Sequence, residues 1–165
     1  VKALMQWLHE SLRDEVPELH ENNVRLNAVG RTDELPKTVQ LALRRALNQT
    51  RDNTGLRLNL ALNYGGRSEL VDAFRKLATE VAAGRTKPKD IDEEQISGAL
   101  YTADLPDPDL LIRTSGEMRL SNFLPWQMVY TEIHFVSDVH WPDFRRQHLY
   151  EAIGIYQQRQ RRFGG

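Results

Sequence analysis

The stretch DPDLLIRTSGEMRLSNFLPWQMVYTE, residues 107–132, decides the fold. Its apolar run at 110–112 follows two prolines and ends in Arg113, which predicts a short buried strand with a cation at its carboxyl end. The mostly apolar segment 122–129 predicts a helix that begins near Ser121, despite an internal proline. Ligands of open α/β sheets bind beyond the carboxyl ends of the strands, so this junction is the predicted binding site.

The polar groups around the predicted helix start suit a highly charged anion. They comprise two guanidiniums, a hydroxyl and backbone amides, from Arg113, Arg119, Leu120 and Ser121. Arginine offers a planar fork of donors that matches phosphate oxygens, so the pattern predicts a diphosphate site. Glu132 adds a hard oxygen ligand, and a carboxylate beside a diphosphate indicates Mg²⁺.

The same residues also have ordinary structural interpretations. Arg113 could pair with Asp107 or Asp109 instead of a phosphate. Ser121 could act as a helix N-cap, which is a common position for serine, and it could cap the helix and bind an anion at once. Glu132 could be an exposed carboxylate at the start of a strand.

Strand and helix patterns alternate along the rest of the chain. Strands are predicted at 24–29, 56–63 and 132–136, and helices at 3–20 (ending near Val16 because of Pro17), 36–50, 68–83, 92–100 and from Pro142 onward. This alternation predicts an α/β fold of three layers with a mostly parallel sheet. Paired glycines in the turn 63–67 allow the backbone to approach closely there.

Length and composition narrow the function classes. A chain of 165 residues suffices for one domain with a sizeable core, and we expect residues 1–165 to form a single domain. The 22 basic and 23 acidic residues balance, which argues against a general nucleic-acid binder. There is no cysteine, which fits a cytoplasmic protein, and no apolar run approaches the roughly 18 residues of a transmembrane helix.

Several stretches resemble the cis-prenyltransferases, the undecaprenyl diphosphate synthase family. They are the 107–132 signature, WPDF (141–144), RRFGG (161–165), NTGLRLNLALNYGGR (53–67) and VPELHENNVRLNAVG (16–30). The resemblance covers nearly the whole chain in order. It implies a transferase that condenses isopentenyl diphosphate onto an allylic diphosphate, such as farnesyl diphosphate. The implied product is a long-chain cis-polyprenyl diphosphate for the carrier lipid of cell-wall synthesis.

The resemblance also implies roles for particular residues. Isopentenyl diphosphate would be bound by Arg113, Arg119, Leu120 and Ser121. Glu132 would be a ligand of Mg²⁺, and the first helix would wall a hydrophobic tunnel for the growing chain. Arg162 and Gly164 would reach the active site across a homodimer interface. An enzyme with so long a lipid product would meet the membrane peripherally.

The chain departs from the family pattern at its beginning. Family members open with a strand, an Asp-Gly-Asn-Gly-Arg-like loop and a Ser-Thr-Glu-Asn-Trp stretch, which are absent from these residues. We therefore expect this chain to be the C-terminal two-thirds of a synthase, with its catalytic residues upstream of Val1 and with negligible activity alone. The alternative is a non-catalytic partner subunit of the same fold, against which the retained Arg113 and Glu132 argue.

Overall fold

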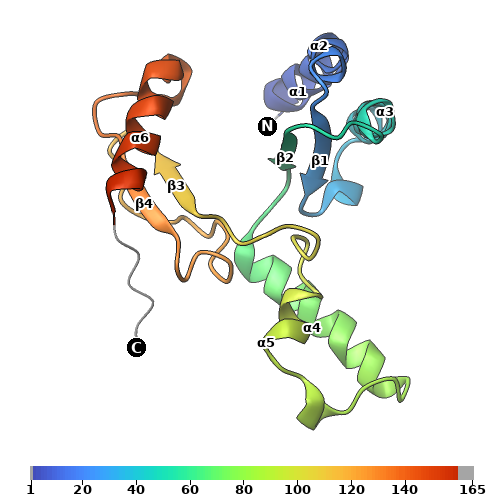
Figure 1. Ribbon diagram of the computed structural model, residues 1–165. Coiled ribbons are helices and arrows are strands. Elements are labelled where there is room, and N and C mark those ends of the chain that lie inside the picture. Colours follow the sequence, from blue (N-terminus) through green and yellow to red (C-terminus); the bar gives the residue numbers. More distant parts are fainter. Residues whose placement is uncertain (1, 160–165) are drawn as a thin grey trace. The chain divides into compact units, whose positions relative to one another are not determined.

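The structure, a computed structural model, describes residues 2–159. Its contacts divide the chain into two compact units, Val1–Thr102 and Ala103–Gly165, which are described separately (Figure 1). Each unit contains one pair of parallel strands with helices, so the predicted α/β class and parallel pairing are confirmed. The prediction of a single domain concerns how the two units associate, and it stays a prediction.

The elements follow the predicted alternation closely. The first unit holds α1 (Lys2–Asp14), α2 (Val16–Glu21), β1 (Arg25–Val29), α3 (Lys37–Thr50), β2 (Arg57–Ala61), α4 (Gly66–Ala82) and α5 (Glu93–Ser97). The second unit holds β3 (Leu110–Arg113), β4 (Glu132–Phe135) and α6 (Arg146–Gln158). Across residues 2–159, no helix combines the length and the apolar character needed to cross a bilayer.

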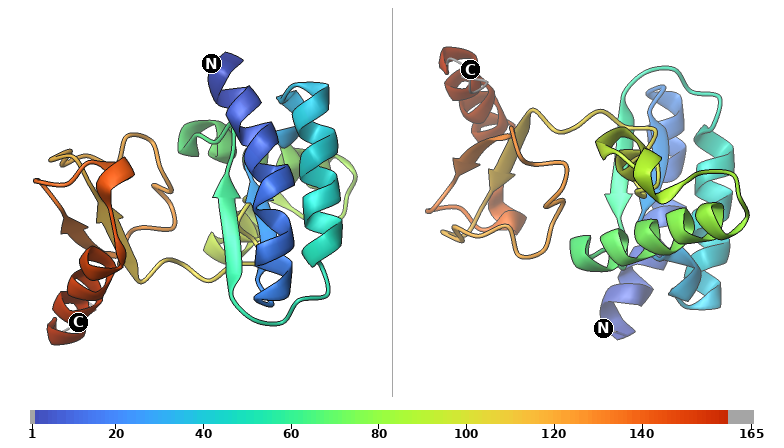
Figure 2. Two further views of the ribbon diagram at one scale, coloured as in Figure 1. Left: turned by 90° about the horizontal axis from the view of Figure 1, so that it is seen from above. Right: turned by 90° about the horizontal axis from the view of Figure 1, so that it is seen from below.

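The core of the first unit lies between its sheet and helices α1 to α3, which stand along one face of the two strands (Figure 2). Val39, Leu43 and Ala46 recur at helical spacing, so α3 buries one apolar stripe. Pro17 lies in the first turn of α2, which explains why the first predicted helix divides there. The buried cluster consists of Leu12, Val16, Leu26, Leu35, Val39, Leu43 and Ala46.

Helices α4 and α5 end and begin as their sequences predict. Gly84 follows α4 with a φ of +71°, a conformation that glycine adopts without strain. Asp92 caps α5, because its Oδ1 accepts the Gln95 N–H at 2.9 Å.

The helix predicted at 122–129 does not form, and the segment is a series of turns. Ser121, Asn122 and Leu124 have φ values of +50°, +65° and +46°, which lie outside the right-handed helical region. Pro125 also lacks an N–H and disfavours a helix in the preceding turn. The apolar composition of this segment reflects partial burial in irregular structure.

The last helix begins later than predicted. Pro142 lies in a short 3₁₀ turn, Trp141–Asp143, and α6 starts at Arg146. The helix is capped by a side chain, because the N–H of Arg145 donates to His148 Nδ1 at 2.9 Å. Proline at the first turn of a helix is a sound signal, but here it marks a separate turn.

Candidate substrate-binding site

The carboxyl end of β3 brings two of the predicted site residues together. Arg113 is the last residue of this strand, and its Nη2 donates to Ser121 Oγ at 3.2 Å. The Nε of Arg113 is buried and has no hydrogen-bond partner among the described residues. The carbonyl of Arg113 accepts the Val136 N–H at 2.7 Å, which fixes the backbone beside the end of β4.

The loop after β3 is folded back by left-handed residues. Ser115 and Gly116 have φ values of +66° and +67°, and the N–H of Ser115 donates to the Val139 carbonyl at 2.9 Å. Ser115 Oγ also lies 3.2 Å from His140 Nδ1. These contacts hold the loop that connects Arg113 to Ser121 against the segment after β4.

Arg119 and Leu120 lie in that loop, and the structure gives each a local partner. The guanidinium of Arg119 forms an ion pair with Glu117 and is 69% exposed. The carbonyl of Leu120 accepts the Phe123 N–H at 3.0 Å. No helix begins at Ser121, so the predicted helix N-terminus at this site is wrong. The predicted binding of a diphosphate by Ser121, Arg113 and Arg119 stays a prediction.

Glu132, the predicted magnesium ligand, is the first residue of β4 and is engaged by a cation. Its Oε2 accepts a hydrogen bond from Arg159 Nη1 at 2.8 Å, and the same nitrogen donates to the Ile133 carbonyl at 3.0 Å. Among residues 2–159 no group of three or more His, Cys, Asp or Glu side chains could hold a metal ion. Mg²⁺ requires octahedral oxygen coordination, so these residues do not by themselves fit the ion.

A second feature that suits the predicted activity is an apolar groove in the first unit. It has a volume of about 420 Å³ and lies between α1, α2 and the strands. The predicted helix face supplies Leu4, Leu8, Leu12 and Val16 to its lining, and β2 supplies Leu58 and Leu60. The alternating leucines of β2 indicated a strand in the sequence, but they did not show that one face would line a groove.

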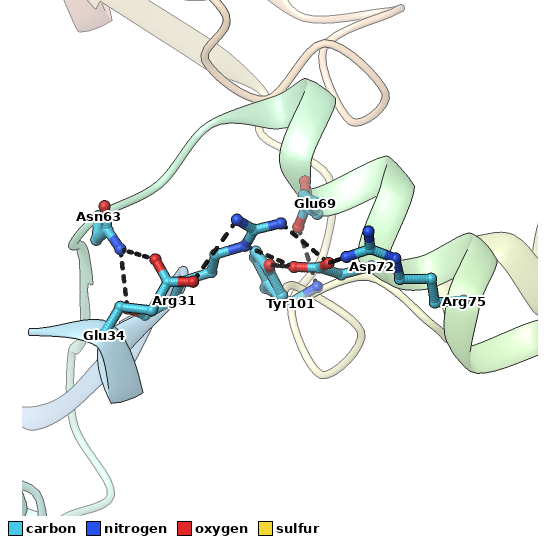
Figure 3. A network of polar contacts seen from close by, with 7 residues as sticks. All are labelled: Arg31, Glu34, Asn63, Glu69, Asp72, Arg75 and Tyr101. Atoms are coloured by element: carbon cyan, nitrogen blue, oxygen red, sulfur yellow. Dashed lines mark hydrogen bonds and ion pairs between the residues drawn. The ribbon is translucent and has the colours of Figure 1, made fainter.

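The ends of β1 and β2 are joined by a network of polar contacts that the sequence did not reveal (Figure 3). Gly30 follows β1 with a φ of +113°, and a Cβ there would lie 2.2 Å from the Leu62 carbonyl oxygen, so only glycine fits. The next residue, Arg31, pairs in bidentate fashion with Asp72 of α4, at 2.8 and 3.0 Å. The Tyr101 hydroxyl donates to the same carboxylate.

The network shifts the pKa values of Asp72 and Tyr101. Hydrogen bonds from Arg31 and then from Tyr101 lower the pKa of Asp72 to about 2. Burial raises the pKa of the Tyr101 hydroxyl, and its hydrogen bond to Asp72 adds to the effect. Residues 31, 72 and 101 are far apart in the sequence, and none shows a local pattern that marks it.

The predicted dimer-crossing residues, Arg162 and Gly164, lie outside the described residues. The homodimer contact assigned to them therefore stays a prediction.

Comparisons with known proteins give the chain its family. A family model described as "Putative undecaprenyl diphosphate synthase" matches residues 1–164. The isoprenyl transferase of Streptococcus thermophilus (strain CNRZ 1066) is 53% identical over 169 residues, which cover 100% of this chain and 68% of that protein. The isoprenyl transferase of Clostridium tetani is 48% identical over 165 residues, covering 100% of this chain and 64% of the relative. The chain thus spans about two thirds of the length of these relatives.

Solved structures agree with the predicted fold class. The lavandulyl diphosphate synthase from Lavandula x intermedia, solved in complex with dimethylallyl diphosphate, has a TM-score of 0.95 and 39% identity, covering 98% of this chain and 70% of that one. A probable undecaprenyl diphosphate synthase from Campylobacter jejuni has a TM-score of 0.84 and 31% identity, and the match covers 99% of this chain and 74% of that one. With its fold, its β3 signature and its matched relatives in agreement, the chain belongs to the undecaprenyl diphosphate synthase family of prenyltransferases.

Proposed function

We propose that the protein containing this chain condenses isopentenyl diphosphate with an allylic diphosphate, with farnesyl diphosphate as the expected starter. The product would be a long-chain cis-polyprenyl diphosphate that serves as a cell-wall carrier lipid. Family membership supports the reaction class, and the matched bacterial relatives bear the name isoprenyl transferase. The Lavandula relative was solved with dimethylallyl diphosphate, which is an allylic diphosphate.

The observation that carries the proposal is the apolar groove of the first unit. Its volume of about 420 Å³ falls within the range of about 300–1,000 Å³ that small-molecule sites occupy. Aliphatic side chains dominate the lining of the groove. Burial of a bound prenyl chain there would stabilise the complex by about 25 cal/mol for each Å² of apolar surface removed from water. Trp7 and Leu4 of α1 are exposed at this groove, which leaves apolar surface for a longer chain.

Arg113 and Ser121 are our proposed ligands of isopentenyl diphosphate. Their contact at 3.2 Å sets a guanidinium and a hydroxyl side by side, and Arg119 in the same loop could turn from Glu117 toward an anion. The reaction joins C4 of isopentenyl diphosphate to C1 of the allylic substrate. The diphosphate group of the allylic substrate leaves C1 with the electron pair of the broken C–O bond, and a proton leaves C2 of the isopentenyl unit. Holding the two substrates in line is the contribution expected of these residues.

Mg²⁺ is the proposed cofactor of the whole enzyme, and Glu132 is its proposed ligand in this chain. Such a role requires Glu132 to leave Arg159 and requires further oxygen donors beyond those that residues 2–159 bring together. We therefore propose that the 165-residue chain alone has negligible turnover.

We also propose that the enzyme is a cytoplasmic homodimer that meets the membrane peripherally. Exposed apolar side chains in the second unit support a protein interface there, namely Trp141, Leu149, Tyr150 and Ile153.

The direct experiment supplies radiolabelled isopentenyl diphosphate, farnesyl diphosphate and Mg²⁺ to the full-length protein and measures labelled polyprenyl product. Elongation by the full-length protein, lost in Arg113→Gln, is the expected result. A folded full-length protein that makes no product with any allylic diphosphate would contradict the proposal. That outcome would favour the second candidate, a non-catalytic partner subunit, which the engagement of Glu132 by Arg159 would suit.

A further inference from the structure

Three segments of the first unit converge on the first turns of α4. They are the turn after β1 at Arg31, the turn after β2 at Asn63, and the segment after α5 at Tyr101 (Figure 3). Each segment contacts the side chain of Glu69 or Asp72, or contacts a residue that does. Long-range polar contacts of this kind fix loops that have no regular pairing of their own.

Arg31 connects the two strand ends to α4. Its N–H donates to the Asn63 carbonyl at 3.3 Å, and its own carbonyl accepts from Asn63 Nδ2 at 3.1 Å. Its guanidinium pairs with Asp72 at 2.8 Å and lies 3.6 Å from Glu34. Asn63 Nδ2 also donates to Glu34 at 2.9 Å, so backbone and side-chain contacts lead from Asn63 to α4.

Tyr101 completes the network from the other side. Its hydroxyl donates to Asp72, and its N–H donates to Glu69 Oε1 at 3.0 Å. Glu69 is only 1% exposed, and its other oxygen accepts the Tyr64 hydroxyl at 2.6 Å. The rings of Tyr64 and Tyr101 pack edge to face with centroids 6.3 Å apart.

The turn that this network holds also lines the apolar groove. Leu62 and Asn63 belong to the groove lining, and Asn63 has a left-handed φ of +47° that its neighbours must maintain. The carbonyl and amide of Asn63 cannot stay in place if Arg31 moves, because both bond to its backbone. The position of this end of the groove therefore depends on contacts made outside the groove.

We infer that Arg31, Asp72 and Tyr101 are positioning residues for the prenyl-chain groove: they hold the Leu62–Asn63 turn in the geometry that accepts the chain. This inference rests on the proposed function, and it adds that affinity for the apolar chain depends on a polar network that the chain does not touch. Lysine cannot replace Arg31, because a bidentate fork is required.

The test is calorimetric binding to the full-length protein, with farnesyl diphosphate and farnesol as probes. Arg31→Lys and Tyr101→Phe should weaken the binding of both probes about fivefold or more. The double variant that combines Arg31→Asp with Asp72→Arg swaps the charges of this ion pair, and it should recover part of the lost binding. Arg85→Lys is the matched control. Arg85 lies just after α4 and forms an ion pair with Glu80 in the last turn of that helix, so this change should leave binding unchanged.

A structural role alone would lower the free energy of unfolding without changing the affinity of the folded molecules. Unfolding curves of each variant therefore correct the binding data for the folded fraction. Amide hydrogen exchange at 62–66 supplies a second readout, and it should speed up in Arg31→Lys and Tyr101→Phe but not in Arg85→Lys.

The outcomes separate this inference from the proposed function. If the unaltered full-length protein binds neither probe, the groove assignment and the inference built on it both fail. If it binds, but the network variants bind equally well and exchange equally slowly at 62–66, the inference is wrong while the proposed function stands. Weakened binding of farnesol as well as farnesyl diphosphate places the effect on the apolar chain and supports the inference.

Discussion

Arg159 donates to the carboxylate of Glu132 across 2.8 Å, so the chain segment after α6 is tied to the first residue of β4. The same guanidinium bonds the Ile133 carbonyl, which makes Arg159 a link between helix and strand as well as a counter-charge. A metal ion and this guanidinium would compete for one carboxylate, and the described residues favour the guanidinium.

The first prediction concerns this pair. Arg159→Gln should lower the free energy of unfolding by about 0.5–1 kcal/mol, because both partners are partly exposed to solvent. Millimolar Mg²⁺ should not raise the thermal midpoint of the unaltered 165-residue chain, since binding to the native state is what would stabilise it. Calorimetric unfolding with and without Mg²⁺ measures both effects. A Mg²⁺-dependent rise that Glu132→Gln abolishes would show that the chain holds the ion by itself.

Substitution of Gly30 and of Gly154 by alanine should change the free energy of unfolding in opposite directions. Gly30→Ala should destabilise the chain by about 2 kcal/mol or more, because its φ is +113° and the added Cβ meets the Leu62 carbonyl oxygen. Gly154 lies within α6 with nothing within 4 Å of a Cβ, so Gly154→Ala should stabilise by about 0.5–1 kcal/mol. Urea unfolding measures both, and equal effects of the two changes would refute the described backbone.

The Asp72 carboxylate predicts a pH dependence of stability. Arg31, Tyr101 and Arg75 face it, and they lower its pKa to about 2. A carboxyl whose folded-state pKa is depressed stabilises the fold above its unfolded-state pKa, about 3.9, and loses that contribution as the pH falls toward about 2.

The corresponding experiment measures the free energy of unfolding at several pH values between about 4.5 and 2.5. The unaltered chain should lose on the order of 1 kcal/mol through this group, because the pair is partly screened by solvent. Asp72→Asn should lack that part of the loss. Asp52→Asn removes an exposed carboxylate and serves as the control, which should follow the unaltered chain. Indistinguishable profiles for all three proteins would contradict the Arg31–Asp72 pairing.

The apolar stripe of α3 predicts a sharp contrast between two leucines. Leu43 is buried in the cluster of the first unit, so Leu43→Ala should cost about 2–5 kcal/mol. Leu41 is 47% exposed on the same helix, and Leu41→Ala should cost less than about 1 kcal/mol. Chemical denaturation of the two variants measures the difference. Similar costs would mean that α3 does not present the described face to the sheet.

Local patterns in the sequence predicted most of the regular structure. The apolar spacing of Val39, Leu43 and Ala46 predicted α3, which buries that stripe, and alternation predicted β1. In β2, exposed residues alternate with partly buried ones. The helix expected after Ser121 failed because apolar composition does not report backbone dihedrals, and three residues there adopt positive φ. Pro125 was the available signal against it.

Contacts between distant segments account for what the sequence did not predict. Arg31 and Asp72 are 41 residues apart, and Tyr101 and Asp72 are 29 apart, so their meeting depends on the fold of the whole unit. The pairing of Arg113 with Ser121 was within reach, because only a short loop separates a strand end from a hydroxyl. The engagement of Glu132 by Arg159 was not, since no periodic pattern joins them.

The central claim is that Arg113 and Ser121 grip the diphosphate of isopentenyl diphosphate, and titration calorimetry of that compound into the 165-residue chain tests it most directly. We predict saturable binding that Arg113→Lys and Ser121→Ala each weaken about fivefold or more, while Arg146→Lys, an exposed change in α6, leaves it unchanged. Equal affinity in all four proteins, or no binding by the unaltered chain, would contradict the claim.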